Sequence, residues 1–211
     1  MAGQVLTIAQ QKGGSGKTTL AVNLAIAYAR AGRSVALLDT DPQGSLGRWF
    51  MARRDRLGDP GLEFSTASAW GVSYEVEKLA RSVDIVIIDT PPKVDADLRP
   101  ALRAAGQVVI PVASSHVDLW ATEGVLDLSR REGRPAAIVI NRARPGTRLG
   151  DGVMTAAQAM GADVAQVTLG NRVIYAETLG EGLSVFETPR GRAAAAEVQA
   201  LADEIVAGYA R

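Results

Sequence analysis

The chain of 211 residues contains no cysteine and a single histidine. Without cysteine there are no disulfides, thiolate metal sites, cysteine-ligated iron–sulfur clusters or thiol catalysis. The lone histidine, His116, argues against a histidine metal site, and we expect it at the surface or beside the functional site. Aromatic residues make up 5% of the chain. Among them, Trp49, Phe50 and Trp70 are expected in the core.

Net charge is also lacking, because 23 basic residues balance 23 acidic ones. Bulk electrostatic attraction to nucleic acid or to a membrane is therefore not expected, and either would need a local basic patch. No uninterrupted apolar run approaches the about 18 residues of a membrane span, and no basic leader precedes an apolar stretch. We expect a cytoplasmic protein.

Hydrophobic residues make up 47% of the chain, enough for one α/β domain over residues 1–211. Apolar runs alternate with helix-like segments, which is typical of a mainly parallel, twisted sheet with helices on both faces. The predicted strands are Val5–Ala9, Ser34–Leu38, Leu62–Thr66, Val83–Ile88, Gln107–Val112, Ala136–Ile140 and Asp163–Thr168. The predicted helices are Lys17–Ala31, Leu46–Arg54, Val72–Arg81, Asp97–Ala105, Leu119–Arg131, Val153–Met160, Arg172–Leu179 and Ala193–Tyr209.

Residues 10–19 read Q-Q-K-G-G-S-G-K-T-T and form a glycine-rich loop between a predicted strand and a predicted helix. Such a loop turns backbone N–H groups toward an anion, and the helix N-terminus adds partial positive charge. Lys17 suits the terminal phosphates of a nucleotide, and the Thr18 hydroxyl suits Mg²⁺. Gln11 replaces a glycine of the strict pattern. The strand–loop–helix context nevertheless favours a phosphate-binding loop over an ordinary turn.

Carboxylates follow two predicted strands at the points where their apolar runs stop. Asp39 and Asp41 follow the second strand, and Asp89 follows the run Ile85–Ile88. Ligands of parallel sheets bind beyond the carboxyl ends of the strands. Asp89 is therefore expected on the magnesium side of a phosphate site, and Asp41 is expected to hold or activate the attacking water. Asp39 is expected to orient either the loop or the water shell of the metal. Without the glycine-rich loop, caps and turns would explain these aspartates.

Four stretches together resemble the ParA/MinD group of ATPases with a deviant phosphate loop, and within it the small ParA-type partition ATPases. They are residues 12–19, 39–43, 89–92 and 108–112, and a looser fifth match runs over residues 172–186. The resemblance implies ATP and Mg²⁺ as cofactors. The implied nucleotide ligands are Gly13, Gly14, Ser15, Gly16, Lys17, Thr18, Thr19 and the adenine-facing Asn141. The implied metal ligands are Thr18, Asp89 and Asp39.

The same resemblance implies that Lys12, Lys17 and Asp41 take part in catalysis. Loss of Asp41 would stop hydrolysis and leave ATP bound, and Pro91-Pro92 would form a switch. Lys12 would reach the nucleotide of a second subunit in an ATP-bound homodimer. A cation supplied from a neighbouring subunit can neutralise charge on the γ-phosphate and would couple hydrolysis to dimerisation.

The resemblance further implies non-specific DNA binding, nucleoid association, and a ParB-like or small adaptor protein that stimulates hydrolysis. Arginine is a good phosphate ligand, and the last third of the chain is rich in it. The candidate DNA contacts are Arg142, Arg144, Arg148, Arg172, Arg190 and Arg192, with Arg172 and Arg190 preferred because they match basic positions of the family.

Two other functions remain open. A membrane-associated positioning ATPase would need a basic, apolar C-terminal helix. The last helix is instead rich in alanine and acidic residues, and the spacing of Val198, Leu201 and Ile205 predicts docking against the domain. No membrane association is expected. A metabolic ATP-dependent ligase of the same fold would need a substrate pocket near Asp41 and would act without DNA or a partner protein.

Overall fold

The computed structural model describes residues 3–93, 98–144, 146 and 148–209. Its strands are β1 (Gln4–Ile8), β2 (Val35–Asp39), β3 (Glu63–Thr66), β4 (Ile85–Asp89), β5 (Gln107–Ala113), β6 (Ala136–Asn141) and β7 (Asp163–Val164). Its α-helices are α1 (Lys17–Arg30), α2 (Ser45–Leu57), α3 (Val72–Ser82), α4 (Arg99–Ala104), α5 (His116–Trp120), α6 (Glu123–Arg131), α7 (Arg148–Gln158), α8 (Ile174–Gly180) and α9 (Arg192–Tyr209). Short 3₁₀ turns are η1 (Ala69–Gly71), η2 (Val185–Glu187) and η3 (Pro189–Gly191).

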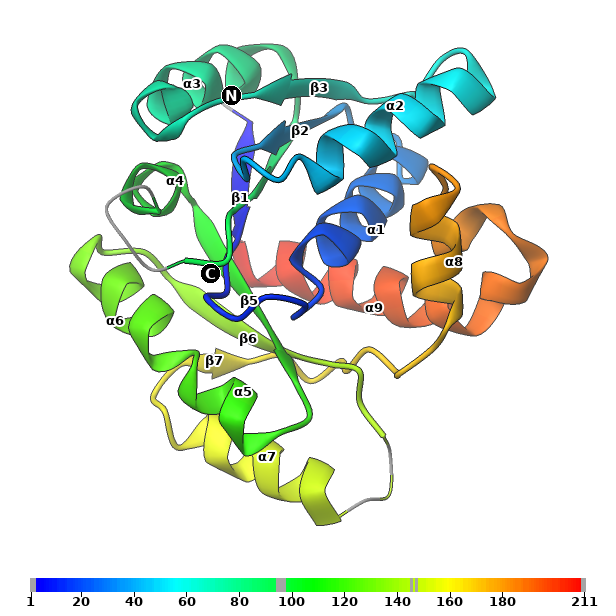
Figure 1. Cartoon of the computed structure of the whole chain (residues 1–211). Helices are drawn as coiled ribbons and strands as arrows, with labels where there is room; N and C mark the ends of the chain where they lie inside the picture. The colour runs from blue at the N-terminus through cyan, green and yellow to red at the C-terminus, as the bar shows by residue number, and fades with distance from the viewer. Residues whose placement is uncertain (1–2, 94–97, 145, 147, 210–211) are drawn as a thin grey trace.

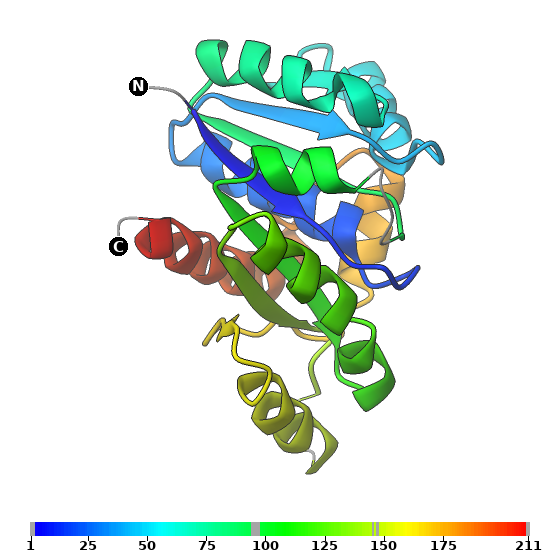
Figure 2. The same ribbon diagram turned by 90° about the vertical axis from the view of Figure 1, so that its left-hand side faces the viewer.

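All seven of these strands pair in parallel in one sheet, in the order β3-β2-β4-β1-β5-β6-β7. Every residue of β2 and β4 is buried, which explains why both read as continuous apolar runs. Helices α1, α2, α8 and α9 pack on one face, and α3, α4, α6 and α7 pack on the other (Figures 1 and 2). The expected fold class is confirmed.

Helix α9 packs along its apolar stripe against α1. Val198, Leu201 and Ile205 are all buried in the core cluster that also contains the apolar face of α1. The predicted docking of the last helix is thus confirmed. Within the described ranges, we find no helix with the length and hydrophobicity that a membrane crossing requires.

Several predicted element bounds are wrong for identifiable reasons. The helix expected over residues 119–131 is split into α5 and α6 at Thr122, whose buried hydroxyl donates to the carbonyl of Asp118 and accepts from the amide of Gln10. The strand expected over residues 163–168 ends at Val164. The N–H of Ala165 still donates to Ile138 of β6, but the N–H groups of Gln166 and Val167 donate to Glu204 of α9 instead of to a strand.

The helix ends were also misplaced. Helix α7 begins at Arg148, five residues before its predicted start at Val153. Helix α8 begins at Ile174, two residues after its own predicted start at Arg172. Helix α4 begins at Arg99, and the predicted start at Asp97 lies outside the described residues.

The tryptophans differ in environment. Trp49 is 2% exposed and its indole N–H donates to the carbonyl of Leu183, as expected for a core residue. Trp70 is 90% exposed, so the prediction that it lies in the core is wrong. It lies on η1, where the chain turns into α3, and α3 buries other positions: Val72, Val76, Leu79 and Ala80.

The sheet register brings the polar strand ends to one edge. Asp89 at the end of β4 pairs in register with Asp39 at the end of β2 and with Ile8 at the end of β1. The glycine-rich loop leaves β1 at this edge, and Asn141 ends β6 on its other side. The candidate residues are therefore gathered at the carboxyl ends of the strands, where ligands of parallel sheets bind.

Candidate nucleotide-binding site

The glycine-rich loop has backbone conformations that its glycines make possible. Gly14 and Gly16 have φ values of 74° and 93°. A Cβ at Gly16 would lie 2.4 Å from Nδ2 of Asn141, so a side chain there would collide with the end of β6. At the loop entry, the buried side chain of Gln10 donates to the hydroxyl of Thr122 at 3.0 Å. The loop is thus fixed at both ends before α1 begins.

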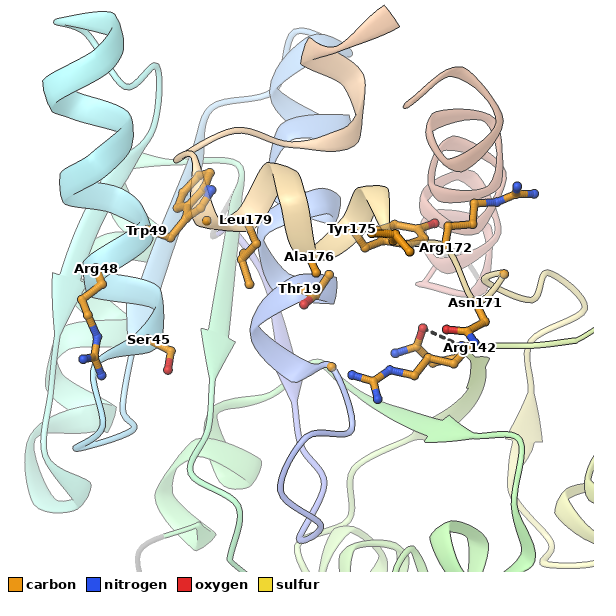
Figure 3. A pocket seen from close by; sticks show the side chains of 15 residues that line it. Thr19, Ser45, Arg48, Trp49, Arg142, Asn171, Arg172, Tyr175, Ala176 and Leu179 are labelled. Carbon is orange, nitrogen blue, oxygen red and sulfur yellow. Dashed lines mark hydrogen bonds between the residues drawn. The ribbon is translucent and has the colours of Figure 1, made fainter. Parts of the chain in front are cut away.

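Two hollows adjoin this loop. One, of about 290 Å³, is lined by residues 13–19 together with Asp41, Pro92 and Arg142. The other, of about 640 Å³, extends from Gly16 and Thr19 past Asn141 to α8, and includes Asn171 and Arg172 (Figure 3). A phosphate chain suits the first hollow, which is lined by the glycine-rich loop and Lys17, and the remainder of a nucleotide suits the second.

Lys17 begins α1 and is 7% exposed. Burial lowers the pKa of its ammonium group, and the carboxylates of Asp89 and Asp41 oppose that shift. Lys17 therefore places a weakly hydrated cation among carboxylates, at the helix N-terminus that favours anions. This arrangement suits the binding of a phosphate group.

Thr18 and Asp89 form the polar pair at the bottom of the site. The Thr18 hydroxyl donates to Oδ2 of Asp89 at 2.6 Å, whereas Oδ1 of Asp89 is buried with no partner among the described residues. Burial raises the pKa of Asp89 to about 7, against the hydrogen bond from Thr18, which lowers it. An unpaired buried carboxylate oxygen beside a hydroxyl is a hard oxygen donor set that fits Mg²⁺.

The pKa of Asp89 predicts how stability depends on pH when nucleotide and magnesium are absent. Because the folded-state pKa is raised from 3.8 to about 7, the folded protein retains a proton that the unfolded chain releases between these values. The contribution of Asp89 to stability is therefore full below pH about 4 and is lost as the pH rises through about 7.

We expect Asp89→Asn to stabilise the protein in EDTA at pH 8 by about 1–3 kcal/mol, or roughly 2–4 °C in Tm per kcal/mol, because a buried charge is removed. At pH 5 the gain should be clearly smaller than at pH 8, because the stability contribution of Asp89 is then only partly lost. Thermal melts at both values check this, with the exposed Asp55→Asn as the control. An equal gain at pH 5 and pH 8 would contradict the assignment.

Asp39 and Asp41 have different environments. Both carboxylate oxygens of the buried Asp39 accept backbone N–H groups, Oδ1 from Asp41 at 3.0 Å and Oδ2 from Gly47 at 2.9 Å. Burial raises the pKa of Asp39, and these bonds oppose the rise. Of the two predicted roles of Asp39, this geometry supports holding the loop rather than ligating the metal. Asp41 is more exposed and faces the smaller hollow, as expected of a residue that handles water.

Lys12 lies at the entry of the loop and forms an ion pair with Asp118 of α5 in the same chain. Asp118 is buried and also accepts from the Ser115 hydroxyl, so its carboxylate is fixed. Lys12 keeps 41% of its side-chain surface exposed. To reach a nucleotide in a second subunit, as the sequence predicts, it must leave Asp118.

Asn141 occupies the expected place at the end of β6 and lines the larger hollow. Its Nδ2 donates to the carbonyl of Ser15 at 2.9 Å, and its Oδ1 accepts from the backbone N–H of Arg142 at 2.9 Å. The residue thus links β6 to the phosphate loop. Its contact with adenine stays a prediction.

The two preferred DNA contacts already have acidic partners. Arg172 pairs with Glu197 of α9 at 2.6 Å, and Arg190 pairs with Glu177 of α8 at 2.9 Å. Both arginines are partly exposed, with 42% and 73% of the side-chain surface accessible. Contact with DNA phosphates would require an exchange of partners, and these assignments stay predictions.

Sequence reasoning missed the role of Asp118 and assigned Arg142 to a DNA patch. Asp118 had a recognisable signal, because Ser115 and Asp118 have the spacing of a helix N-cap directly after a strand end at the site edge. Arg142 follows Asn141 directly, and the structure places it on both hollows. No local sequence pattern marks that position.

Together, the parallel sheet, the phosphate-type loop and the Thr18–Asp89 pair define a P-loop nucleotide-binding protein. Residues 6–185 match the model of the CobQ/CobB/MinD/ParA nucleotide binding domain. The chain belongs to this family, and the resemblance to ParA-type P-loop ATPases is confirmed.

Relatives by sequence include proteins that distribute cellular cargo. The chain is 30% identical over 208 residues to maintenance of carboxysome distribution protein A of Halothiobacillus neapolitanus, covering 95% of both chains. It is 34% identical over 166 residues to chromosome partitioning protein ParA of Caulobacter vibrioides. That match covers 60% of this chain and 61% of the ParA protein.

Solved structures share the fold at lower identity. The cell division ATPase MinD of Pyrococcus furiosus has a TM-score of 0.79 at 18% identity, covering 97% of this chain and 99% of that one. An ATP complex of McdA from Cyanothece has a TM-score of 0.77 at 17% identity, covering 95% and 96%. Cobyrinic acid a,c-diamide synthase of Mycobacterium smegmatis, with a bound ATP analogue and magnesium, has a TM-score of 0.76 at 20% identity, covering 97% and 94%.

Proposed function

We propose that this chain is a Mg²⁺-dependent ATPase that dimerises when ATP is bound, binds DNA non-specifically and positions a cargo. A ParB-like or small adaptor protein would stimulate hydrolysis, and the protein would be associated with the nucleoid in the cytoplasm. The main support for this proposal is the phosphate-type loop with two lysines, Lys12 and Lys17, which lies beside Asp41 and the Thr18–Asp89 pair. The relatives that distribute carboxysomes or partition chromosomes support the positioning role.

In this proposal each group has a defined task. The loop N–H groups and Lys17 bind the phosphates, and Thr18 and Asp89 hold Mg²⁺, which supplies charge neutralisation at the phosphates when bound. Asp41 orients the attacking water from the edge of the smaller hollow. Lys12 leaves Asp118 and neutralises charge on the nucleotide of the second subunit. Hydrolysis then requires the dimer, and ATP turnover separates the dimer and releases the protein from DNA.

The membrane-associated alternative has less support, since the apolar stripe of α9 is buried against α1. The metabolic ligase shares the fold with the cobyrinic acid enzyme, and fold alone does not favour its chemistry. A ligase would turn over ATP without DNA. ATP turnover measured with and without DNA therefore separates the ligase from the positioning ATPase.

The proposal predicts a dimer that depends on Lys12. In sedimentation velocity with AMPPNP and Mg²⁺, the wild-type protein should be dimeric, and Lys12→Ala should bind AMPPNP yet remain monomeric. Only the dimer should bind DNA, with an affinity that falls steeply as salt rises. The matched control is Lys78→Ala, which removes a lysine that pairs with Glu75 on the surface of α3.

Two results would contradict this proposal. An intact dimer of Lys12→Ala would remove the cross-subunit role of Lys12. Equal binding of the wild-type protein to DNA with ADP and with AMPPNP would remove the nucleotide switch.

A further inference from the structure

Arg142 has an unusual backbone conformation. Its φ is 53°, and among the residues that the structure describes it is the one non-glycine residue with a positive φ. The left-handed region is unfavourable for a residue with a side chain. Such a conformation persists where the surroundings impose it, and it is enriched at functional sites.

The conformation of Arg142 is held by the phosphate loop through Asn141. Oδ1 of Asn141 accepts from the backbone N–H of Arg142, and Nδ2 of the same side chain donates to the carbonyl of Ser15, both at 2.9 Å. The position of the Arg142 backbone is therefore coupled to the loop that is built for phosphate. An ordinary surface turn would not need this link.

The Arg142 side chain extends along the site. It lines the smaller hollow together with Lys17 and Asp41, and it lines the larger hollow together with Asn141. Figure 3 shows it running from the end of β6 toward the N-terminal end of α1. Within the described part of the chain, its guanidinium has no ion pair or hydrogen bond, in contrast to that of Arg172, which pairs with Glu197.

The charges around the smaller hollow need a second cation. Lys17 lies beside two carboxylates, Asp41 and Asp89, and Lys12 is already paired with Asp118. Without Arg142, carboxylates would therefore outnumber free cations where a polyanionic phosphate chain binds. A guanidinium presents several donors in a plane that matches phosphate oxygens.

We propose that Arg142 is a phosphate ligand, whose guanidinium binds the phosphate chain of the nucleotide beside Lys17. The inference rests on the proposed nucleotide function and adds a residue to it. It also reassigns Arg142 from the DNA patch to the nucleotide. The strained backbone is then explained, because it aims the side chain back over the loop.

The test uses Arg142→Gly, because glycine adopts a φ of 53° without strain and should leave the fold intact. Calorimetric titration with ADP and Mg²⁺ should show affinity roughly 10- to 100-fold weaker than wild type. Arg142→Lys keeps the positive charge and loses the planar guanidinium. Its affinity for ADP should lie between those of the wild type and Arg142→Gly. The matched control is Arg33→Ala, which removes an exposed arginine two residues before β2. Melting temperatures without nucleotide check folding.

Tripolyphosphate, which has no nucleoside, distinguishes phosphate contact from base contact. The affinity for tripolyphosphate is measured by competition with fluorescent ADP. The Arg142→Gly substitution should weaken it by the same factor as it weakens the affinity for ADP. Affinity for ADP within twofold of wild type, or a loss for ADP without a loss for tripolyphosphate, would overturn the inference and leave the proposed function standing. If the wild-type protein bound neither ADP nor ATP, the proposed function itself would fail.

Discussion

Replacing Lys17 with alanine is expected to weaken nucleotide binding by roughly 100-fold or more. Lys17 is a nearly buried cation at the N-terminus of α1, and the neighbouring carboxylates Asp41 and Asp89 would be left without it. A phosphate chain would then enter a hollow whose side-chain charges are mostly negative. The loop N–H groups and Arg142 would have to offset that repulsion without Lys17.

Calorimetry with ADP and with ATPγS in the presence of Mg²⁺ measures the effect. Lys12→Ala is the informative comparison, because Lys12 forms an ion pair with Asp118 and does not line the smaller hollow. It should bind the same ligands within about threefold of wild type. Affinity of Lys17→Ala within tenfold of wild type would show that the loop binds phosphate without its central lysine, and would refute the assignment.

Replacing Asp41 with alanine is expected to lower the hydrolysis rate by about 10²–10⁴-fold, the usual contribution of a positioned general base. Binding of ATP should remain, because Asp41 lies at the edge of the smaller hollow and repels the phosphates rather than holding them. The ATP-bound dimer should therefore accumulate. Single-turnover hydrolysis and equilibrium binding, measured on the same preparation, separate the two effects.

Asp41 also has a structural role that needs its own control. Its Oδ1 accepts from the backbone N–H of Gln43 at 2.9 Å, within the turn that leads into α2. Asp41→Asn keeps an acceptor for that turn and removes the negative charge. It should hydrolyse ATP as slowly as the alanine variant. Wild-type hydrolysis by Asp41→Asn would assign the residue to the turn alone.

The strand-end aspartates illustrate how far sequence reasoning reached. Asp39 and Asp89 could be placed at one sheet edge because each follows an apolar run, and the register confirms that placement. Their different tasks could not be predicted. Both oxygens of Asp39 are used by backbone N–H groups, one of them from Gly47 in the next helix, while one oxygen of Asp89 has no partner.

The wrong predictions have a common cause in contacts between distant segments. The helix is interrupted at Thr122, whose hydroxyl accepts a hydrogen bond from Gln10, 112 residues away. Beyond strand β7, the N–H groups of Gln166 and Val167 bind Glu204 of α9 rather than the neighbouring strand. Trp70 is a separate case: it was placed in the core by its residue type, but it lies on η1, outside α3, and is exposed. Propensity and periodicity describe local preference, and such long-range bonds override it.

The fold class, the glycine-rich loop and the residues at the strand ends could all be predicted from the sequence. These follow from local features: apolar runs of strand length, glycines that permit positive φ, and lysine and threonine at fixed spacing. Only the folded chain shows that Lys12 pairs with Asp118, that Asp39 accepts N–H groups of the following loop and helix, and that Arg142 lines the two hollows beside the glycine-rich loop. Each of these depends on which side chains meet once parallel strands from distant parts of the chain lie side by side, and no neighbouring residues record that geometry.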